Sequence, residues 1–354
     1  MRVKLRHALT LSAIAFVGTA GAAELQQIGK IAVPGSPLGT YDISFWDPST
    51  NRYYLADRTN KSLDIFDGAS DTFISRVPGF VGQQKSNDTS GPDGVQIIGD
   101  QAWVGDGDST IKIIDLKSDK VVSTISTGGK ARVDEMAYDP VDHAFIGANN
   151  AEDPPFSTVI STEGDHKVIG KVAFTDATNG AEAPVFSHGM FFQAIPQLGP
   201  DKTKGGVAVI DPKTAKLVRM MPVGNCSPSG LAAGPGDNLL LGCTAGDKEG
   251  LPPVAVVMNA QTGEVIKTIK GPGGNDMVAY SPSAGLYYTA SRDLVTGPEL
   301  NVIDAKTNTL QQTIKLPGGN PHSVAVNESN GHVYVPLGVK GGGCGGCIAV
   351  FAAK

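Results

Sequence analysis

The sequence predicts an all-β protein: a seven-bladed β-propeller with four antiparallel strands in each blade and a ring closed by the N-terminal strand, which completes the last blade. Three observations predict this fold. One strand pattern recurs seven times, its recurrences are spaced by 45 to 50 residues, and the two ends of the chain supply complementary parts of one blade. An interval of this length holds four short strands with their turns, which is the content of one propeller blade.

The recurring pattern is an alternating apolar strand that usually closes on an acidic or amide residue and runs into a short polar turn. The closing positions of the seven recurrences are Asp67, Asp115, Ser161, Asp211, Asn259, Asp304 and Ala352. This strand is the third of its blade. In the sixth repeat the four expected strands cover 277–280, 286–290, 300–304 and 310–316, with alternating outer strands and more continuously apolar inner strands.

The two ends of the chain indicate how the ring closes. Residues 25–33 have the pattern of a fourth strand, whereas the C-terminus at Lys354 follows closely on a third strand. The last blade therefore lacks one strand, which the N-terminal segment supplies. This pairing removes two exposed sheet edges at once.

Residues 1–22 have the composition of a cleavable signal peptide. A basic start, an apolar stretch at 8–18 and small residues at 20–22 fit that pattern. The remaining chain, 23–354, is therefore expected to be a single propeller domain that is periplasmic or secreted. The apolar stretch is shorter than the ~20 residues needed to span a bilayer, so no membrane insertion is expected.

Three phrases of the repeats carry a family resemblance. They are Gly-Gly-Asn-Pro-His-Ser-Val-Ala-Val at 318–326, His-Val-Tyr-Val at 332–335, and Val-Ile-Asp at 302–304 with Thr307. They resemble the YVTN-repeat β-propeller family, and the resemblance extends over essentially the whole exported chain. It implies the fold but no single activity, because the repeat describes a scaffold with many functions. The chain departs from the pattern in its third blade, where Ser161 replaces the closing acid, and in an enlarged loop of the fourth.

Charge and motifs exclude several partners. The chain carries 29 basic and 35 acidic residues, a net charge of −6, and loss of the signal peptide would remove basic residues only. Such a surface repels phosphate backbones, so no nucleic-acid partner is expected, although some relatives in the YVTN-repeat family bind single-stranded DNA. No glycine-rich phosphate loop is present, so no nucleotide cofactor is expected.

An acidic ring is expected at one end of the channel. The first strand of each blade lines a propeller's channel, and its first residue lies at the mouth. Seven residues take this position: Asp42, Asp93, Asp134, Glu182, Ser229, Asp276 and His322. Crowded carboxylates raise each other's pKa unless a cation or basic side chains compensate. The sequence therefore predicts a divalent cation, calcium or a similar ion, with Asp134, Glu135, Glu182 and Asp276 as its ligands. The alternative is that single acids cap local turns.

Basic residues and loops are expected at the same mouth. Arg58, Arg132 and Arg292 either neutralise the acids directly or hold an anionic ligand. The residues expected to contact a ligand are Asp42, Asp93, Arg58, Arg132, Arg292 and His322. Polar residues that follow second strands should reach the same end: Asp57, Asp106, Asp108, Asn149 and Asn150. Long loops such as 196–206 emerge there too, and binding usually resides on such loops.

Four cysteines, an even number in an exported chain, favour two disulfides. Cys226 precedes a first strand and Cys243 ends the adjacent second strand, so these two are expected to be bonded. Cys344 and Cys347 form a CxxC in a glycine-rich loop, where a local disulfide is expected and a redox or metal role stays open. No histidine follows this motif as haem attachment requires, so no haem is expected.

Three functional hypotheses follow, and whether the protein is an enzyme stays open. The first is a binding or scaffold propeller that holds a small molecule or a protein, together with a divalent cation, at the acidic mouth. The second is a metal-dependent hydrolase or lactonase of the gluconolactonase type, in which the cation polarises a carbonyl and His322 or Glu135 transfers the proton. The third is a protein-interaction platform formed by the long loops. The protein is expected to be a monomer.

Overall fold

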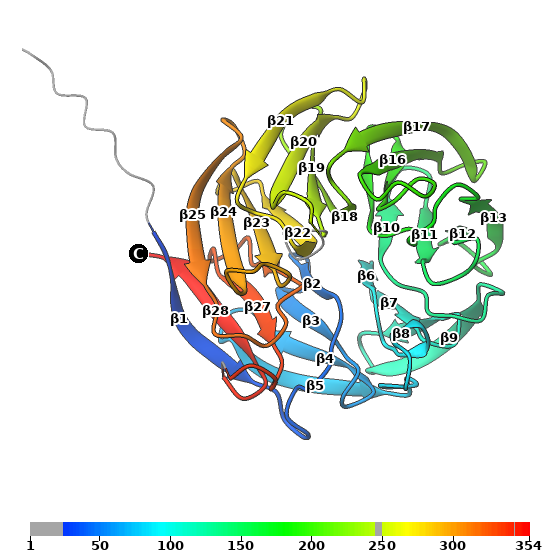
Figure 1. Ribbon diagram of the computed structural model, residues 1–354. Helices are drawn as coiled ribbons and strands as arrows, with labels where there is room; N and C mark the ends of the chain where they lie inside the picture. Colours follow the sequence, from blue (N-terminus) through cyan, green and yellow to red (C-terminus); the bar gives the residue numbers. More distant parts are fainter. Residues whose placement is uncertain (1–23, 245–249, 343) are drawn as a thin grey trace, which may run out of the picture.

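The computed structural model describes residues 24–244, 250–342 and 344–354, which form a ring of seven four-stranded antiparallel sheets (Figure 1). Each sheet is one blade, and its strands follow one another outward from the central channel. The predicted seven-bladed β-propeller is therefore confirmed. The predicted signal peptide, 1–22, lies outside the described residues.

The first six blades each take their four strands from one continuous segment. Blades 1 and 2 consist of β2 (Ser44–Asp47), β3 (Arg52–Asp57), β4 (Ser62–Asp67), β5 (Thr72–Pro78), β6 (Val95–Ile98), β7 (Gln101–Asp106), β8 (Thr110–Asp115) and β9 (Lys120–Ser126), with the 3-10 helix η1 (Asn87–Thr89) between them. Blades 3 and 4 consist of β10 (Met136–Asp139), β11 (Ala144–Asn149), β12 (Phe156–Ser161), β13 (Val168–Ala173), β14 (Pro184–Ser187), β15 (Met190–Ile195), β16 (Lys204–Asp211) and β17 (Lys216–Gly224). Blades 5 and 6 consist of β18 (Pro228–Ala233), β19 (Asn238–Cys243), β20 (Val254–Asn259), β21 (Val265–Lys270), β22 (Asn275–Ser281), β23 (Leu286–Ser291), β24 (Glu299–Asp304) and β25 (Thr309–Lys315).

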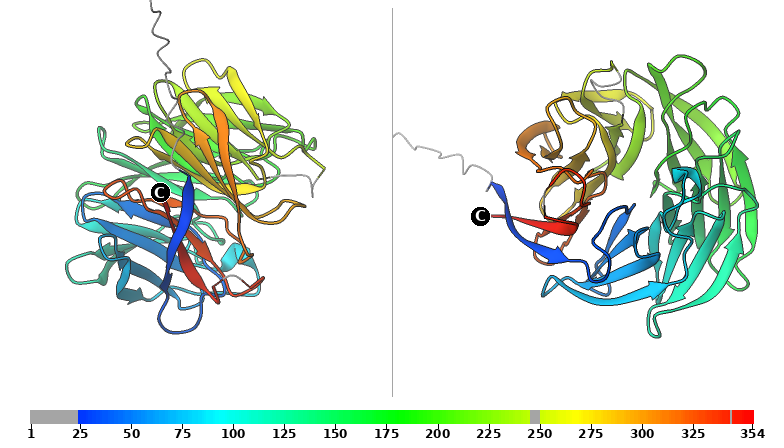
Figure 2. Two further views of the ribbon diagram at one scale, coloured as in Figure 1. Left: turned by 90° about the vertical axis from the view of Figure 1, so that its left-hand side faces the viewer. Right: turned by 60° about the horizontal axis from the view of Figure 1, so that its bottom comes forward.

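Blade 7 joins the two ends of the chain, as predicted. It consists of β26 (Ala325–Val326), β27 (Val333–Leu337), β28 (Cys347–Ala353) and, as its outer strand, β1 (Leu25–Ala32). Strand β1 runs antiparallel to β28 and lies beside it in both views of Figure 2. Gln312 of blade 6 accepts a hydrogen bond from the Leu25 N–H and donates one to the Leu25 carbonyl, each at 2.9 Å. The closing strand is thus also fixed to the neighbouring blade.

The acid that closes each third strand has a local structural role. The Asp67 carboxylate accepts the backbone N–H groups of Ala69 and Ser70, at 3.1 and 2.8 Å. The same kind of bond is made by Asp115, Asp211, Asn259 and Asp304. An Asp or Asn at this place turns the chain into the fourth strand because its side chain satisfies the N–H groups of the turn. The most regular feature of the repeat therefore encodes turns rather than the functional site.

The hydrophobic core is divided into seven clusters, each of which spans two neighbouring blades. Between blades 2 and 3, for example, Trp103 packs with Phe145, and both side chains are fully buried. Burial of this apolar surface joins each blade to the next around the ring. The first strands are therefore held by packing on a rigid scaffold. The predicted mouth residues lie two or three positions before these strands in blades 1 to 4 and 7, rather than being their first residues, and within the strands in blades 5 and 6.

The cysteines form two disulfides, Cys226–Cys243 and Cys344–Cys347, as predicted. The Cα atoms of Cys226 and Cys243 lie 5.0 Å apart, so this bond ties the entry of β18 to the end of β19. Disulfides of this kind indicate a protein of an oxidising compartment. Within the described part of the chain, no helix has the length and apolar character needed to cross a membrane.

Candidate functional site

The residues predicted at the channel mouth occupy equivalent positions in their blades. In blades 1 to 4, the backbone N–H of the mouth residue donates to a carbonyl on the second strand. These pairs are Asp42 with Ala56, Asp93 with Gly105, Asp134 with Ala148, and Glu182 with Ala194. Glu182 has the least sequence context of the four, yet it shares the backbone position of the three aspartates.

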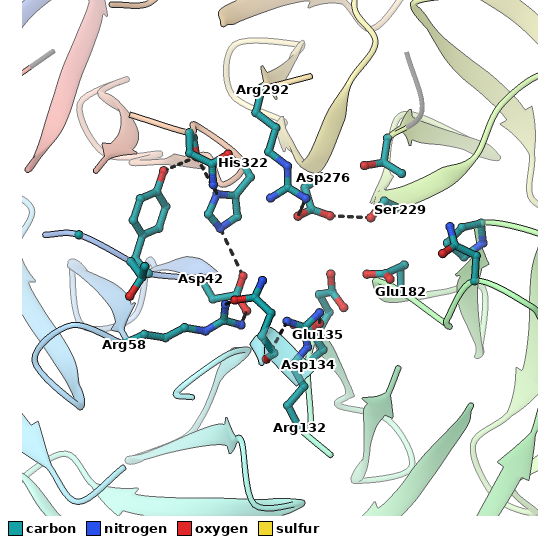
Figure 3. A pocket seen from close by; sticks show the side chains of 18 residues that line it. Asp42, Arg58, Arg132, Asp134, Glu135, Glu182, Ser229, Asp276, Arg292 and His322 are labelled. Atoms are coloured by element: carbon teal, nitrogen blue, oxygen red, sulfur yellow. Dashed lines mark hydrogen bonds and ion pairs between the residues drawn. The ribbon is translucent and has the colours of Figure 1, made fainter. Parts of the chain in front are cut away.

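These side chains surround a cavity of about 230 Å³ at the mouth, and Figure 3 shows them converging on the channel from different blades. The residues predicted for the site that line the cavity are Asp42, Arg58, Arg132, Asp134, Glu135, Glu182, Asp276, Arg292 and His322. Asp93 is completely buried and contacts Arg58. The nine residues therefore lie together at one end of the channel, and Asp93 is joined to them through Arg58.

Arg58 serves two of the acids. Its guanidinium pairs with both Asp42 and Asp93, and its Nε lies 2.9 Å from Asp93 Oδ1. Burial raises the pKa of Asp42, but Arg58 and His322 more than offset burial, so that the pKa lies well below its usual range. Burial outweighs Arg58 at Asp93 and raises the pKa of that carboxyl well above its usual value. The single positive charge of Arg58 therefore compensates one negative charge on the pair of aspartates, Asp42 and Asp93.

The other two arginines are also paired with mouth acids. Arg132 lies 2.6 Å from Asp134, and Arg292 lies 3.0 Å from Asp276. Asp276 in addition accepts the hydroxyl of Ser229 at 2.6 Å. Two roles were predicted for the arginines, neutralisation of the acidic ring and binding of an anionic ligand. These contacts agree with the first role.

His322 has partners on both ring nitrogens. Its Nδ1 donates to the Asn320 carbonyl at 2.7 Å, since a carbonyl can only accept. Its Nε2 lies 3.3 Å from Asp42 Oδ1. The ring stacks on Tyr41, with centroids 4.6 Å apart, and the Tyr41 hydroxyl donates to the Pro336 carbonyl at 2.6 Å. The imidazole is therefore locked in place by backbone, carboxylate and aromatic ring.

Glu135 and Glu182 differ from the other acids, because within the described residues neither forms an ion pair. Glu135 is 3% exposed, and its Oε2 has no hydrogen-bond partner among the described residues. Burial, then Asp134 and Glu182, raise the pKa of Glu135 well above its usual value. Burial and Asp276 raise the pKa of Glu182 to about 7, although Arg132 partly offsets them. Carboxylate oxygens of Asp134, Glu135 and Glu182 all lie within 4.8 Å of one another.

Several polar residues predicted at this end do not take part in the site. Asp57 accepts hydrogen bonds from Asn60 and lies 3.5 Å from Arg76, and Asp106 pairs with Lys112, so both are held by contacts within their own blades. None of the five lines the cavity: Asp57, Asp106, Asp108, Asn149 and Asn150. Asn150 nevertheless contacts the site, since its Nδ2 donates to both Asp134 and Glu182.

The cavity wall also contains residues that the sequence reasoning missed. They are Tyr41, Asn87, Asn179 and Asn320. All four lie in the irregular links that lead into first strands, where no periodic pattern defines a position. For Tyr41 a signal was present, because it directly precedes the mouth residue Asp42 and is the aromatic partner of His322.

No protein-family model matches the chain, and the curated proteins contain no match to it. The functional argument therefore depends on the fold and the chemistry of the mouth. The fold supports a ligand-binding or interaction platform in general, and the acidic side chains are of the kind that can bind a metal ion.

Proposed function

We propose that this chain is an exported β-propeller of the YVTN-repeat type, periplasmic or secreted, that binds a ligand together with a divalent cation such as calcium at its acidic mouth. The location is supported by the two disulfides and by the composition of residues 1–22. The cation is supported chiefly by one observation: the buried Glu135 and the half-buried Glu182 lie close to Asp134, while the arginines pair with other acids or with Asp134 alone.

The charge balance of the mouth favours a bound cation. Six carboxylates meet three guanidinium groups there, and Arg58 lies within the group formed by Asp42, Asp93 and Asp134. In the second group, Asp134 with Glu135 and Glu182, Arg132 pairs with Asp134, and neither glutamate forms an ion pair among the described residues. A buried carboxylate without a partner is costly and either takes up a proton or binds a cation.

The spacing of the second group suits calcium. Calcium–oxygen distances are about 2.3–2.6 Å, so two ligand oxygens of one ion lie at most ~5 Å apart. Oxygens of Asp134, Glu135 and Glu182 fall within that limit at 4.8 Å. Calcium takes about six to eight oxygens, so three carboxylates leave positions open for water or for oxygen atoms of a ligand in the 230 Å³ cavity. Asp276, the fourth predicted ligand, instead pairs with Arg292.

The hydrolase hypothesis receives less support from this geometry. His322, its expected acid–base residue, uses one ring nitrogen for the Asn320 carbonyl and faces Asp42 with the other. A residue held in this way positions Asp42 rather than offering a free nitrogen to a substrate. Ligand binding with a cation is therefore the function proposed here.

The test is calcium binding by protein purified without chelator, measured by metal analysis and by calorimetric titration at pH 8. An alkaline buffer is chosen because protons compete with the ion at Glu182, whose pKa lies at about 7. We expect one ion per chain and a rise in Tm that EDTA reverses. Glu135→Gln and Glu182→Gln should each abolish both effects.

Glu264→Gln is the matched control, because Glu264 is an exposed acid on the hairpin between β20 and β21. It removes the same charge at a position that lines neither the mouth cavity nor the rest of the channel and should leave calcium binding unchanged. If neither calcium, magnesium, manganese nor zinc binds to the wild-type protein, the cation part of the proposal is wrong.

A further inference from the structure

A second cavity lies in the channel beyond the mouth and is not used by the site described above. It has a volume of about 500 Å³ and is lined by the first strands of six blades: β2, β6, β10, β14, β22 and β26. This volume falls in the range of small-molecule sites, about 300–1,000 Å³. We call this cavity the lumen.

The walls of the lumen are apolar, and aromatic side chains line its far end. Val95, Val185 and Val278 line its length. Tyr138, Phe186 and Tyr280 each lie four residues after a mouth acid and are half-buried. Since a first strand begins at the mouth, these aromatics belong to the opposite end of the channel. We call this group of three aromatic residues the rim. It offers apolar and aromatic surface to a molecule that enters from the face opposite the mouth.

Glu135 forms the boundary between the mouth and the lumen, because it lines both cavities. The backbone carbonyl of Glu135 accepts a hydrogen bond from an N–H group of the second strand. In blades 1, 2 and 4 the equivalent bond is accepted by the carbonyls of Ile43, Gly94 and Ala183. The fold thus accepts an apolar or small residue here. A carboxylate with an unpartnered oxygen at such a position points to a ligand that supplies the missing positive charge.

The charged residues that line the lumen are all acidic. Among its described lining residues, Glu135 and Glu328 are acidic, and lysine, arginine and histidine do not occur. Glu328 is half-buried, and one of its carboxylate oxygens accepts the backbone N–H of Ser283 at 3.2 Å while the other has no partner among the described residues. Glu135 is the more deeply buried of the two. Aromatic rings of the rim also attract cations through their faces. Charge and shape together therefore select a molecule with an apolar body and a cationic head.

We infer that the lumen is a binding site for an apolar primary amine, whose ammonium group pairs with Glu135 and whose alkyl or aryl body lies between the valine walls and the aromatic rim. This site differs from the cation site in its entrance and in the class of its ligand. The inference does not rest on the proposed function, because an ammonium group needs no metal ion to pair with Glu135.

The experiment is calorimetric titration of the full exported chain with three probes of matched shape, carried out in EDTA. The probes are 2-phenylethylamine, 2-phenylethanol and 3-phenylpropionate. We expect the amine to bind about tenfold or more tightly than the alcohol, since a charged hydrogen bond replaces a neutral one, and the carboxylate not to bind. Equal binding of amine and alcohol would overturn the inference.

Variants locate the site. Glu135→Gln should remove the preference for the amine, whereas Glu328→Gln and the exposed control Glu264→Gln should keep it. Gln96 lines the lumen and is half-buried, so Gln96→Arg should weaken amine binding through repulsion without a change in the mouth acids. Amine binding that survives both Glu135→Gln and Gln96→Arg would place the ligand elsewhere and refute the assignment. Because EDTA is present throughout, failure of the calcium proposal leaves this result unaffected.

Discussion

Arg58 is the side chain whose removal should damage the mouth most. Its side chain is 4% exposed and supplies the positive charge for Asp42 and Asp93, whose side chains are 8% and 0% exposed. Arg58→Met keeps a long side chain but removes the charge and its hydrogen bonds. The negative charge of the Asp42 and Asp93 pair is then left buried without the guanidinium that compensates it.

The expected cost follows from the burial of this group. Removing one partner of a buried ion pair costs about 3–5 kcal/mol, because the remaining charge stays desolvated. Unfolding entropy is about 2.1 cal/mol/K per residue, which for a propeller of this length converts the cost into a fall in Tm of about 4–7 °C. The assay is thermal unfolding at pH 7.5, followed by circular dichroism and checked by denaturant titration.

Two controls make the Arg58 experiment decisive. Arg219→Met removes an arginine on the outer strand β17 that donates to the carbonyls of Ala260 and Gln261, and it should cost much less. Combining Arg58→Met with Asp42→Asn removes the charge that Arg58 compensated and should recover part of the loss. If Arg58→Met is no less stable than Arg219→Met, the mouth is not held together by its arginines and the charge balance argued above is wrong.

Three further predictions concern the scaffold. Burial, and then the neighbouring Asp64, raise the pKa of Asp57 to about 7. The folded protein therefore keeps a proton that the unfolded chain releases near about pH 4, so this group's contribution to stability falls as pH rises from ~4 to ~7, and Asp57→Asn should flatten that part of the measured pH profile. Replacing Cys226 and Cys243 together by alanine opens a loop closed over a separation of 17 residues and should lower the free energy of unfolding by about 3 kcal/mol; an unchanged denaturation midpoint would contradict this. Phe351→Ala should cost about 3–5 kcal/mol in guanidinium titrations, because Phe351 is 1% exposed in the cluster between blades 6 and 7, and a loss below about 1 kcal/mol would show that the closing blade contributes little.

The blade count and the mouth positions could be predicted because both depend on local patterns at a constant spacing. The turn after Asp304, for example, is made by the Asp304 side chain itself within three residues. Once the seven repeats fix the phase of the blades, the mouth position of every blade follows. Closure of the ring was equally predictable, since residues 25–33 and the last strand each lack the partner that the other provides.

Pairing within the site could not be predicted, because it depends on the reach of long side chains between blades. Arg58 contacts Asp93, 35 residues away in the next blade, and nothing in either local sequence indicates that bond. Asp57 precedes Arg58 directly, yet its carboxylate turns to Arg76 within its own blade rather than to the cavity. The lumen was missed for the same reason: Tyr138, Phe186 and Tyr280 look like ordinary strand residues until the ring brings their strands together.

Glu135 separates the requirements of the fold from those of function, and one substitution tests this separation. Ile43, Gly94 and Ala183 occupy its place in other blades, so the scaffold does not require a carboxylate there. A buried carboxylate with an unpartnered oxygen destabilises the protein when no cation is bound, and an apolar side chain of similar length removes that cost. Glu135→Met should therefore raise the stability of the metal-free protein in EDTA by about 1–3 kcal/mol while it abolishes calcium binding and amine preference. A residue whose replacement stabilises the protein and abolishes binding serves ligand binding rather than stability. If Glu135→Met instead destabilises the metal-free protein, Glu135 is a structural residue, and both sites that were assigned to it lose their main support.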